Sequence, residues 1–389
     1  MQRHSVRIFS ILIAVILSAP AMAEDMFVYF GSHGSGPHIG FSIAHFDTGT
    51  GKMTEPVFLE EAVAPAYFII RPDGRRLYTC NSFPGSSVSA YAIDPATAKL
   101  RFLNQQPSGG GDPSYVSLDP SGRYLMVANF LGGSAAVFAL RPDGSIGRRT
   151  AFIQHIGASL DPHDPRHAHA HSIRFDPSHH FVLLADLGLD KIFIYRLNPN
   201  TGALTSNDPP FASVAPGSGP RHTAFDPRGR YVYVINQTAN SIVRCGWDSN
   251  RGALTPFETV STLPEGFKGE NMGSEILMHP SGKFLYATNR GNNSVAVFSV
   301  QRDTGRLTPI QLISTQGKTP RNAEFDPTGK WLLVSNQDSN NAVIFRIDQS
   351  TGHLTQNGDP VSVPAPFCER FLAAGKSPQG EKVRTSGGR

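Results

Sequence analysis

One pattern recurs six times along the chain, and it restricts the fold more than any other feature. Each copy contains a short apolar run, a turn centred on proline, a basic residue, a second apolar run, and then Asn or Asp. The copies are residues 68–81, 116–129, 173–186, 224–236, 276–289 and 323–336. Their turn prolines are spaced by 48, 57, 50, 53 and 47 residues, at Pro72, Pro120, Pro177, Pro227, Pro280 and Pro327. A fixed register at a period near fifty residues indicates an array of equivalent structural units.

The chemistry of the turn defines the unit. Proline fixes φ for the second position of the turn and the glycine that usually follows lets the chain reverse, so the flanking apolar runs form a β-hairpin. A third apolar run follows each copy, at residues 87–93, 134–140, 191–197, 241–247, 294–300 and 341–347. In most copies a second turn and a weaker apolar stretch come next, which makes four antiparallel strands per repeat. Four-stranded units of this length are the blades of a β-propeller, and the period is too long for a helical solenoid.

The two ends of the chain predict how the ring closes. Residues 27–33, 41–47 and 56–61 resemble the second, third and fourth strands of a blade whose first strand is missing. Residues 363–372 form one strand with no partner of its own. We therefore predict an all-β, seven-bladed β-propeller over residues 24–373, in which the C-terminal strand pairs with the N-terminal blade and completes it. Closure of this kind leaves only short, protected sheet edges.

Residues 1–23 have the features of a secretory signal peptide. Arg3 and Arg7 precede an apolar run over residues 8–17, and residues 21–23 read Ala-Met-Ala. The run is too short to span a bilayer, so we expect cleavage after Ala23 rather than the alternative, a retained membrane anchor. The mature protein would then be periplasmic or secreted, with no membrane attachment. Residues 374–389 form a basic tail that we expect to be disordered.

The formal net charge of +4 does not describe the folded body of the protein. The signal segment contributes +2 and the tail +3, which leaves −1 for residues 24–373. A nearly neutral body gives no reason to expect a nucleic acid or an anionic membrane as a partner.

Cysteines and histidines raise the questions of a disulfide and a metal. Cys80, Cys245 and Cys368 all lie in apolar runs. One disulfide with a leftover thiol and three buried thiols are both compatible with that placement. Residues 161–171 contain four histidines, but no cysteine or carboxylate pattern accompanies them, so we predict no metal site.

The propeller register predicts which side chains surround one mouth of the central channel. Innermost strands line the channel, and the start of each lies beside the end of the antiparallel second strand. The polar and charged side chains at these positions are His171, Arg221, His222, Gln237, Glu275, Arg290, Arg321, Asn322 and Gln337. They come from consecutive repeats, so we expect them to converge.

This set of side chains suits a small, anionic, oxygen-rich molecule. Guanidinium groups hold carboxylate or phosphate in a fork geometry, and His or Glu can exchange protons near neutral pH. The alternative is a network of ion pairs that merely fills the channel. The chain has no Gly-rich phosphate loop and no Gly-x-Ser-x-Gly elbow, so we expect neither a bound cofactor nor an acyl-enzyme serine.

Several stretches of the chain resemble one known family. They are HAHSIRFDP (169–177), VLLADLGLDKIFIYRL (182–197), GPRHTAFDP (219–227), SEILMHPSGKFLYATNRG (274–291) and TPRNAEFDPTGKWLLVSNQD (319–338). On these residues the chain resembles the lactonase family of seven-bladed propellers, which includes 6-phosphogluconolactonases and carboxymuconate-lactonising cyclases. The resemblance covers about residues 26–372. It implies a site at His171, Arg221, His222, Glu275, Arg290, Arg321 and Gln337.

The resemblance implies a hydrolase of a sugar-type or other anionic lactone. In this hypothesis Glu275 or His171 activates water for attack on the ring carbonyl. Arg290 and Arg321 hold the anionic group and stabilise the oxyanion, while His222 protonates the leaving alkoxide. Arg290 thus belongs with the catalytic residues.

The remaining mouth residues are expected to bind the substrate, and they are Arg221, Arg321, Asn322, Gln237 and Gln337. The family usually has glutamate where this chain has Gln237, and an amide cannot accept a proton at neutral pH as a carboxylate does. Two alternatives therefore stay open. One is a lactonising cycloisomerase that acts on an unsaturated dicarboxylic acid, and the other is a non-catalytic ligand-binding or scaffold propeller.

Overall fold

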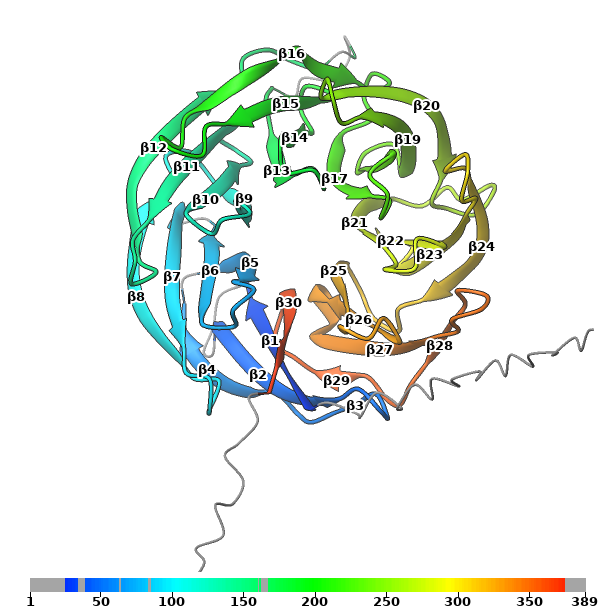
Figure 1. The fold of residues 1–389 in the computed structure, drawn as a ribbon. Helices are drawn as coiled ribbons and strands as arrows, with labels where there is room; N and C mark the ends of the chain where they lie inside the picture. Colours follow the sequence, from blue (N-terminus) through cyan, green and yellow to red (C-terminus); the bar gives the residue numbers. More distant parts are fainter. Residues whose placement is uncertain are drawn as a thin grey trace, which may run out of the picture.

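The computed structural model describes residues 25–33, 39–62, 64–82, 85–159, 161 and 167–374 of the chain. Within these residues the strands form seven antiparallel sheets around one central axis (Figure 1). This arrangement confirms the all-β, seven-bladed propeller predicted from the six repeats and the two ends. The helical element of this described part is the short 3-10 turn η1 (Gln337–Ser339).

Every blade has the same strand order from the channel outward. The innermost strands are β5 (Pro65–Ile70), β9 (Pro113–Leu118), β13 (Ala170–Phe175), β17 (Pro220–Phe225), β21 (Met272–Met278), β25 (Pro320–Phe325) and β30 (Pro366–Ala373). The second strands are β6 (Arg76–Asn81), β10 (Tyr124–Asn129), β14 (Val182–Asp186), β18 (Tyr231–Asn236), β22 (Phe284–Arg290), β26 (Trp331–Asn336) and β1 (Asp25–Ser32). The third strands are β7 (Ser87–Ile93), β11 (Ser134–Leu140), β15 (Lys191–Leu197), β19 (Ser241–Asp248), β23 (Ser294–Val300), β27 (Asn341–Ile347) and β2 (Gly40–Asp47).

The outermost position differs between blades. Five blades have one continuous outer strand, namely β8 (Leu100–Pro107), β12 (Ile146–Gln154), β16 (Leu204–Ser213), β20 (Ala253–Ser261) and β24 (Leu307–Ser314). In the other two blades the outer position is divided between short strands, β3 (Lys52–Met53) with β4 (Val57–Glu61), and β28 (Leu354–Gln356) with β29 (Val361–Ser362).

The second strands are buried on both faces because each blade packs against a neighbour on either side. Every residue of β10 and of β26 is buried. Burial on both faces explains why the run after each proline turn is continuously apolar rather than alternating. The outer strands β12 and β24 contain exposed residues over much of their length, because they form the outer surface of the ring.

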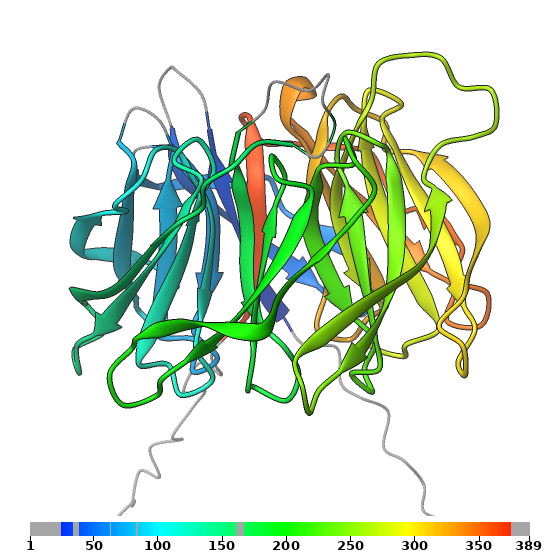
Figure 2. The ribbon, with the colours of Figure 1, turned by 90° about the horizontal axis from the view of Figure 1, so that it is seen from above.

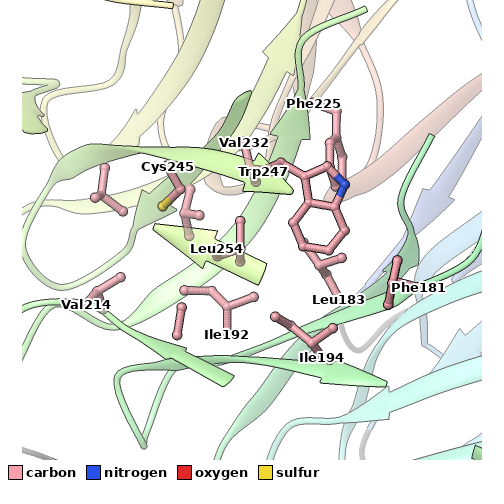
Figure 3. Packing of buried hydrophobic residues seen from close by; sticks show 13 residues of the cluster. Phe181, Leu183, Ile192, Ile194, Val214, Phe225, Val232, Cys245, Trp247 and Leu254 are labelled. Carbon is pink, nitrogen blue, oxygen red and sulfur yellow. The ribbon is translucent and has the colours of Figure 1, made fainter. Parts of the chain in front are cut away.

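Figure 3 shows the apolar core between two adjacent blades. Phe181 and Ile192 from one blade meet Val232 and Trp247 from the next. The indole ring of Trp247 meets the rings of Phe181 and Phe225 nearly edge-on, with centroids 5.6 and 5.9 Å apart. Full burial of a large apolar side chain contributes about 1.5–3 kcal/mol, so such interfaces hold the blades in their places around the axis.

The C-terminal strand closes the ring as predicted. Strand β30 pairs antiparallel with β1 and is the innermost strand of the blade formed by β1 to β4. In Figure 1 the two strands, red and dark blue, lie side by side. Beyond the ladder, the Ala374 amide donates a hydrogen bond to the Asp25 carbonyl at 3.0 Å. The two described ends of the chain are therefore joined in one sheet.

The structure answers the question of a disulfide but does not describe the predicted signal segment or tail. Cys80, Cys245 and Cys368 are buried free thiols, which leaves no disulfide. The signal segment, residues 1–23, lies outside the described residues, and so does the tail beyond Ala374. In the residues that are described, no helix is long and apolar enough to cross a membrane.

Candidate active site

The start of each innermost strand carries a β-bulge at one equivalent position. Pairing with the second strand skips one residue, or two in β21. The skipped residues are Ala66, Ser114, His171, Arg221, Ser274 with Glu275, Arg321 and Phe367. Successive side chains of a regular strand point to opposite faces, whereas a bulge re-aims one of them. The bulges thus allow consecutive residues such as Arg221 and His222 to reach the same mouth.

The mouth that holds these bulges is the upper side of the ring in Figure 2. The connections from second to third strands lie on this side, and η1 and the link between β20 and β21 rise above it (Figure 2). The histidines and arginines predicted at the mouth come from β13, β17, β22 and β25. Glu275 comes from β21, Asn322 from β25, and Gln237 and Gln337 directly follow β18 and β26.

His222 and Glu275 form a buried pair at the centre of this mouth. Their side chains are 5% and 7% exposed, and His222 Nδ1 lies 2.8 Å from Glu275 Oε1. The other carboxylate oxygen accepts a hydrogen bond from Asn322 Nδ2 at 2.7 Å, and the Ile276 amide donates to Oε1 at 3.0 Å. Three donors, on the innermost strands of three blades, therefore fix the carboxylate of Glu275. They are His222 of β17, Ile276 of β21 and Asn322 of β25.

The hydrogen bonds determine which nitrogen of His222 is available for chemistry. Nδ1 of His222 faces Glu275 Oε1 at 2.8 Å and Arg221 Nη1 at 3.4 Å. The carboxylate contact is the shorter one, and a carboxylate only accepts, so it places the hydrogen on Nδ1 and leaves the lone pair on Nε2. Nε2 is buried and has no hydrogen-bond partner among the described residues. Burial, then the nearby charge of Arg221, lowers the pKa of His222 well below 6.5, and burial raises the pKa of Glu275. His222 is thus a neutral base at neutral pH.

Aromatic rings surround His222 and hold its orientation. The ring of Tyr115 lies 5.1 Å away and nearly perpendicular, and Tyr67 lies 6.0 Å away in a similar orientation. His171 approaches from another blade with its ring 5.1 Å from that of His222, and Phe130 lies against His171 at 5.3 Å. Such edge-to-face contacts restrict the imidazole rings and shield them from bulk water.

Three guanidinium groups share the mouth without an ion-pair partner among the described residues. Arg221 Nη1 donates to the Ser274 carbonyl at 2.6 Å. Arg290 Nη2 donates to Gln237 Oε1 at 2.8 Å and to the Gly273 carbonyl at 3.3 Å. Arg321 stacks on Phe367, 3.6 Å from the ring centroid. All three are held by neutral groups.

The positive charge of these arginines is poorly compensated. Burial lowers the pKa of Arg221, Arg290 and Arg321, and the positive charge of Arg221 lowers the last two further. Nε of Arg221 and Nε of Arg290 are buried and have no hydrogen-bond partner in the described part. An anion bound among them would relieve the repulsion and accept the spare N–H groups.

The bulge residues enclose a small cavity below the mouth. It has a volume of about 20 Å³ and is lined by Ala66, Tyr67, Ser114, His171, Arg221, Arg321, Asn322 and Phe367. A cavity of about 10–15 Å³ already holds one water molecule, so this one accepts only a water-sized group.

Gln337, a predicted site residue, takes part less directly, and His169 of the histidine-rich segment 161–171 lies apart from the site. Gln337 is the first residue of η1, and its backbone N–H donates to the Thr319 carbonyl at 2.9 Å. Its side-chain Oε1 is buried and has no hydrogen-bond partner among the described residues. His169 does not join His171: it stacks on Phe130 at 4.7 Å and its Nδ1 faces the Phe130 carbonyl. Among the described residues, no group of three His, Cys, Asp or Glu could hold a metal ion.

The glycine of the Asn-Arg-Gly stretch, Gly291, has a steric explanation. Its φ is +130°, and a Cβ there would lie 2.1 Å from the Glu270 carbonyl oxygen. Only glycine fits this close approach of the link between β20 and β21.

Strand β30 contributes residues to the mouth that were not predicted from the sequence. Arg370 pairs with Glu324 at 2.8 Å, lies 4.6 Å from the centre of the Tyr67 ring and donates to Asn322 Oδ1 at 3.3 Å. Asn322 therefore links the Arg370–Glu324 ion pair to the carboxylate of Glu275. Strand β30 has no turn proline by which to align it. An alternative marker existed, because Pro366 opens β30 as Pro65, Pro113, Pro220 and Pro320 open other innermost strands.

Comparisons with known proteins agree with this architecture. A family model described as "Lactonase, 7-bladed beta-propeller" matches residues 27–371. A 6-phosphogluconolactonase of Bacillus subtilis (strain 168) is 35% identical over 346 residues, which cover 88% of this chain and 97% of that protein. A 6-phosphogluconolactonase of Formosa agariphila is 32% identical over 297 residues, covering 75% of this chain and 83% of that protein.

A solved structure also superposes on this chain. The periplasmic gluconolactonase of Pseudomonas aeruginosa superposes with a TM-score of 0.85 at 29% identity, covering 90% of this chain and 99% of that one. The matches extend over nearly the whole propeller and confirm the resemblance inferred from the sequence. The chain belongs to the lactonase family of seven-bladed β-propellers.

Proposed function

We propose that this protein hydrolyses anionic, sugar-type lactones at the mouth formed by β13, β17, β21 and β25. The observation that carries the proposal is the His222–Glu275 pair. The free Nε2 of His222 lies in the same mouth as three arginines that have no ion-pair partner in the described part of the chain. The names of the relatives, 6-phosphogluconolactonase and periplasmic gluconolactonase, support lactones as the substrate class.

In the proposed mechanism His222 Nε2 accepts a proton from water, and the water oxygen attacks the ring carbonyl carbon. Arg221 and Arg321 stabilise the negative charge that develops on the carbonyl oxygen. The ring C–O bond then breaks, and the imidazolium of His222 returns the proton to the departing alkoxide. The product is a hydroxy acid, whose ionisation releases one proton to solvent.

This assignment differs from the roles first expected for the carboxylate and the histidine. Glu275 already accepts three hydrogen bonds, which leaves it suited to orienting His222 rather than to activating water itself. Asn322 supports that carboxylate, and Arg290 is free to hold an anionic substituent of the substrate. His171 lies beside His222 and would order the water or the leaving oxygen.

We further propose that the protein acts outside the cytoplasm. The pattern of residues 1–23 and the periplasmic location named for the Pseudomonas aeruginosa relative support this. An aldonolactone or another acidic lactone met in that compartment is then the expected substrate.

A panel of lactones, assayed with purified mature protein by proton release, tests the proposal. We expect turnover above the spontaneous rate, unchanged by a chelator, with release of one proton per lactone. A lactonising cycloisomerase would instead convert an unsaturated dicarboxylic acid without consuming water. A rate equal to spontaneous hydrolysis for every lactone, together with simple binding of the acids, would contradict the proposal and favour a ligand-binding propeller.

A further inference from the structure

A groove on the outside of the ring is lined by three arginines and, among the described residues, by no carboxylate. It lies between the outer strands of two neighbouring blades, β8 and β12, and has a volume of about 380 Å³. Its lining includes Arg141, Arg148 and Arg149 together with Pro107, Phe138 and Gly147. None of the lining residues is a mouth residue. A groove of this size accommodates a small ligand or a short segment of a polymer.

Irregular pairing of β12 brings two of the arginines into the groove together. Arg148 and Arg149 are consecutive, and a regular strand would point them to opposite faces of the sheet. The register between β11 and β12 shifts twice, once on each side of the Phe138–Arg149 pair, and such shifts re-aim side chains. Gly147 lies at one of these shifts, where a Cβ would be 2.8 Å from the Ala139 carbonyl oxygen. The glycine therefore permits the irregularity that presents both arginines.

Neutral contacts hold the guanidinium groups of Arg141 and Arg149 in place. Arg141 Nη1 donates to the Ser145 hydroxyl and to the Ile146 carbonyl, both at 3.2 Å. The guanidinium of Arg149 lies over the ring of Phe152, 5.0 Å from the ring centroid. Both side chains are thus oriented by groups that leave their positive charge uncancelled.

The two walls of the groove are joined by a side chain of β8. Asn104 Nδ2 donates to the Ile146 carbonyl at 2.7 Å, and the Ile146 amide donates back to Asn104 Oδ1 at 2.8 Å. This pair of hydrogen bonds connects β8 to the first residue of β12 in the next blade. The groove is therefore preformed, which lowers the entropic cost of binding a ligand there.

The charge of this groove is not balanced by nearby carboxylates. None of its arginines takes part in an ion pair among the described residues. Asp143 precedes β12, but its carboxylate accepts two hydrogen bonds from Ser145 and does not line the groove. The basic pocket between the blades of β17 and β21 differs, because Asp226 lines it and pairs with Arg228 at 3.8 Å. A ligand with two or more anionic groups would balance the charges of the groove.

We propose that this groove binds an acidic oligosaccharide, whose carboxylates contact the three arginines and one of whose sugar rings packs on Phe152. Guanidinium groups hold carboxylates in a fork geometry. The side chain of Phe152 is 39% exposed beside Arg149, and an apolar ring next to a charge matches a sugar acid, which has an apolar C–H face and a charged edge. A chain of uronate units supplies several carboxylates at a regular spacing. The groove is separate from the mouth, so the proposal does not depend on the proposed function.

Isothermal titration calorimetry with hexagalacturonate tests the proposal. We expect the wild type to bind it, with an affinity that falls as the salt concentration rises, because the contacts are between exposed charges. R148A/R149A should lower the affinity by at least about tenfold, and F152A by about threefold to tenfold. Lactone turnover by R148A/R149A should equal that of the wild type.

The matched control is R228A/R302A, which removes two exposed arginines from the basic pocket between the blades of β17 and β21. It should bind hexagalacturonate as the wild type does. No binding by the wild type at low salt, or equal losses in R148A/R149A and R228A/R302A, would overturn the proposal. An unchanged affinity in F152A would refute the sugar contact.

Three further probes identify the chemistry of the ligand. The methyl ester of hexagalacturonate has the same sugar rings without charge and should not bind measurably. Polyphosphate and single-stranded DNA carry comparable negative charge without uronate units and should bind more weakly than hexagalacturonate. Equal binding of the ester, or tighter binding of polyphosphate or DNA, would overturn the assignment of an acidic oligosaccharide.

Discussion

At the scale of single residues, the carboxylate of Glu275 determines the tautomer of His222. E275Q keeps the shape of the side chain but can present an N–H group to Nδ1, which would place the imidazole hydrogen on Nε2. We expect kcat to fall by about 100-fold or more, the usual contribution of a general base, while KM changes little. Steady-state kinetics of lactone hydrolysis would show this, and a kcat within threefold of the wild type would contradict it.

The pH dependence of activity follows from the same pair. The active form has a neutral His222, and its pKa lies below 6.5 because burial and Arg221 disfavour the imidazolium. Activity should therefore be constant around neutral pH and decline only well below pH 6.5, where the pH approaches the lowered pKa of His222. A profile of kcat/KM, corrected for spontaneous hydrolysis, measures this limb. An apparent pKa above 6.5 on the acid side would argue against His222 as the base.

Counting back from the turn prolines placed His171, Arg221 and Glu275 at one mouth, and the structure puts them there. The β-bulges could not be predicted in the same way. No glycine marks the skipped positions, and regular alternation would have sent Arg221 and His222 to opposite faces. The hydrogen bonds among these residues likewise depend on side-chain rotamers, which the sequence pattern does not specify.

At the scale of elements, β30 determines whether the ring is closed. Without it, β1 would present an open edge to the channel, and buried residues such as Phe68 and Phe41 would lose the packing of Cys368 and Leu372. Truncation after Ala365 should lower the melting temperature by at least about 10 °C or produce aggregated protein. Thermal unfolding with size-exclusion chromatography measures both effects.

A matched truncation after Ala374 is the control for this prediction. It keeps every described contact of β30, including the hydrogen bond from Ala374 to Asp25. If the two truncated proteins melted at the same temperature and were both monomeric, β30 would not be needed for closure.

The elements themselves were largely predictable because each repeat carries its own turn. The six proline turns predicted the positions of six blades, and the unpaired C-terminal strand predicted the seventh. The divided outer strands, β3 with β4 and β28 with β29, were not predictable. Outer strands have one exposed face and weak apolar patterns, so the sequence sets their ends poorly.

At the scale of the whole molecule, a buried carboxyl group in the closing strand β30 makes the free energy of unfolding depend on pH. Glu369 of β30 is fully buried, while its neighbour Arg370 pairs with Glu324. Burial raises the pKa of Glu369 from 4.5 to about 8. Between these values the unfolded chain has lost the proton and the folded chain keeps it, so the free energy of unfolding falls as the pH rises.

E369Q should remove this dependence because the amide does not ionise. Near pH 4.5 the wild type and E369Q should have similar melting temperatures. Toward pH 8 and above, E369Q should be the more stable protein. Parallel melting curves at all pH values would show that Glu369 does not carry its proton in the folded state.

The propeller brings together residues that are far apart in the chain. His171 and Asn322 lie on different blades, yet both reach the surroundings of His222 and Glu275. The central claim is that this convergence forms the catalytic site. We would measure kcat/KM of H222N with an anionic lactone. The control is Q301E, in the exposed turn between β23 and β24 on the opposite face of the ring. We expect a loss of about 100-fold or more for H222N and none for Q301E. Wild-type activity in H222N would show that the convergence of these residues does not form the catalytic site.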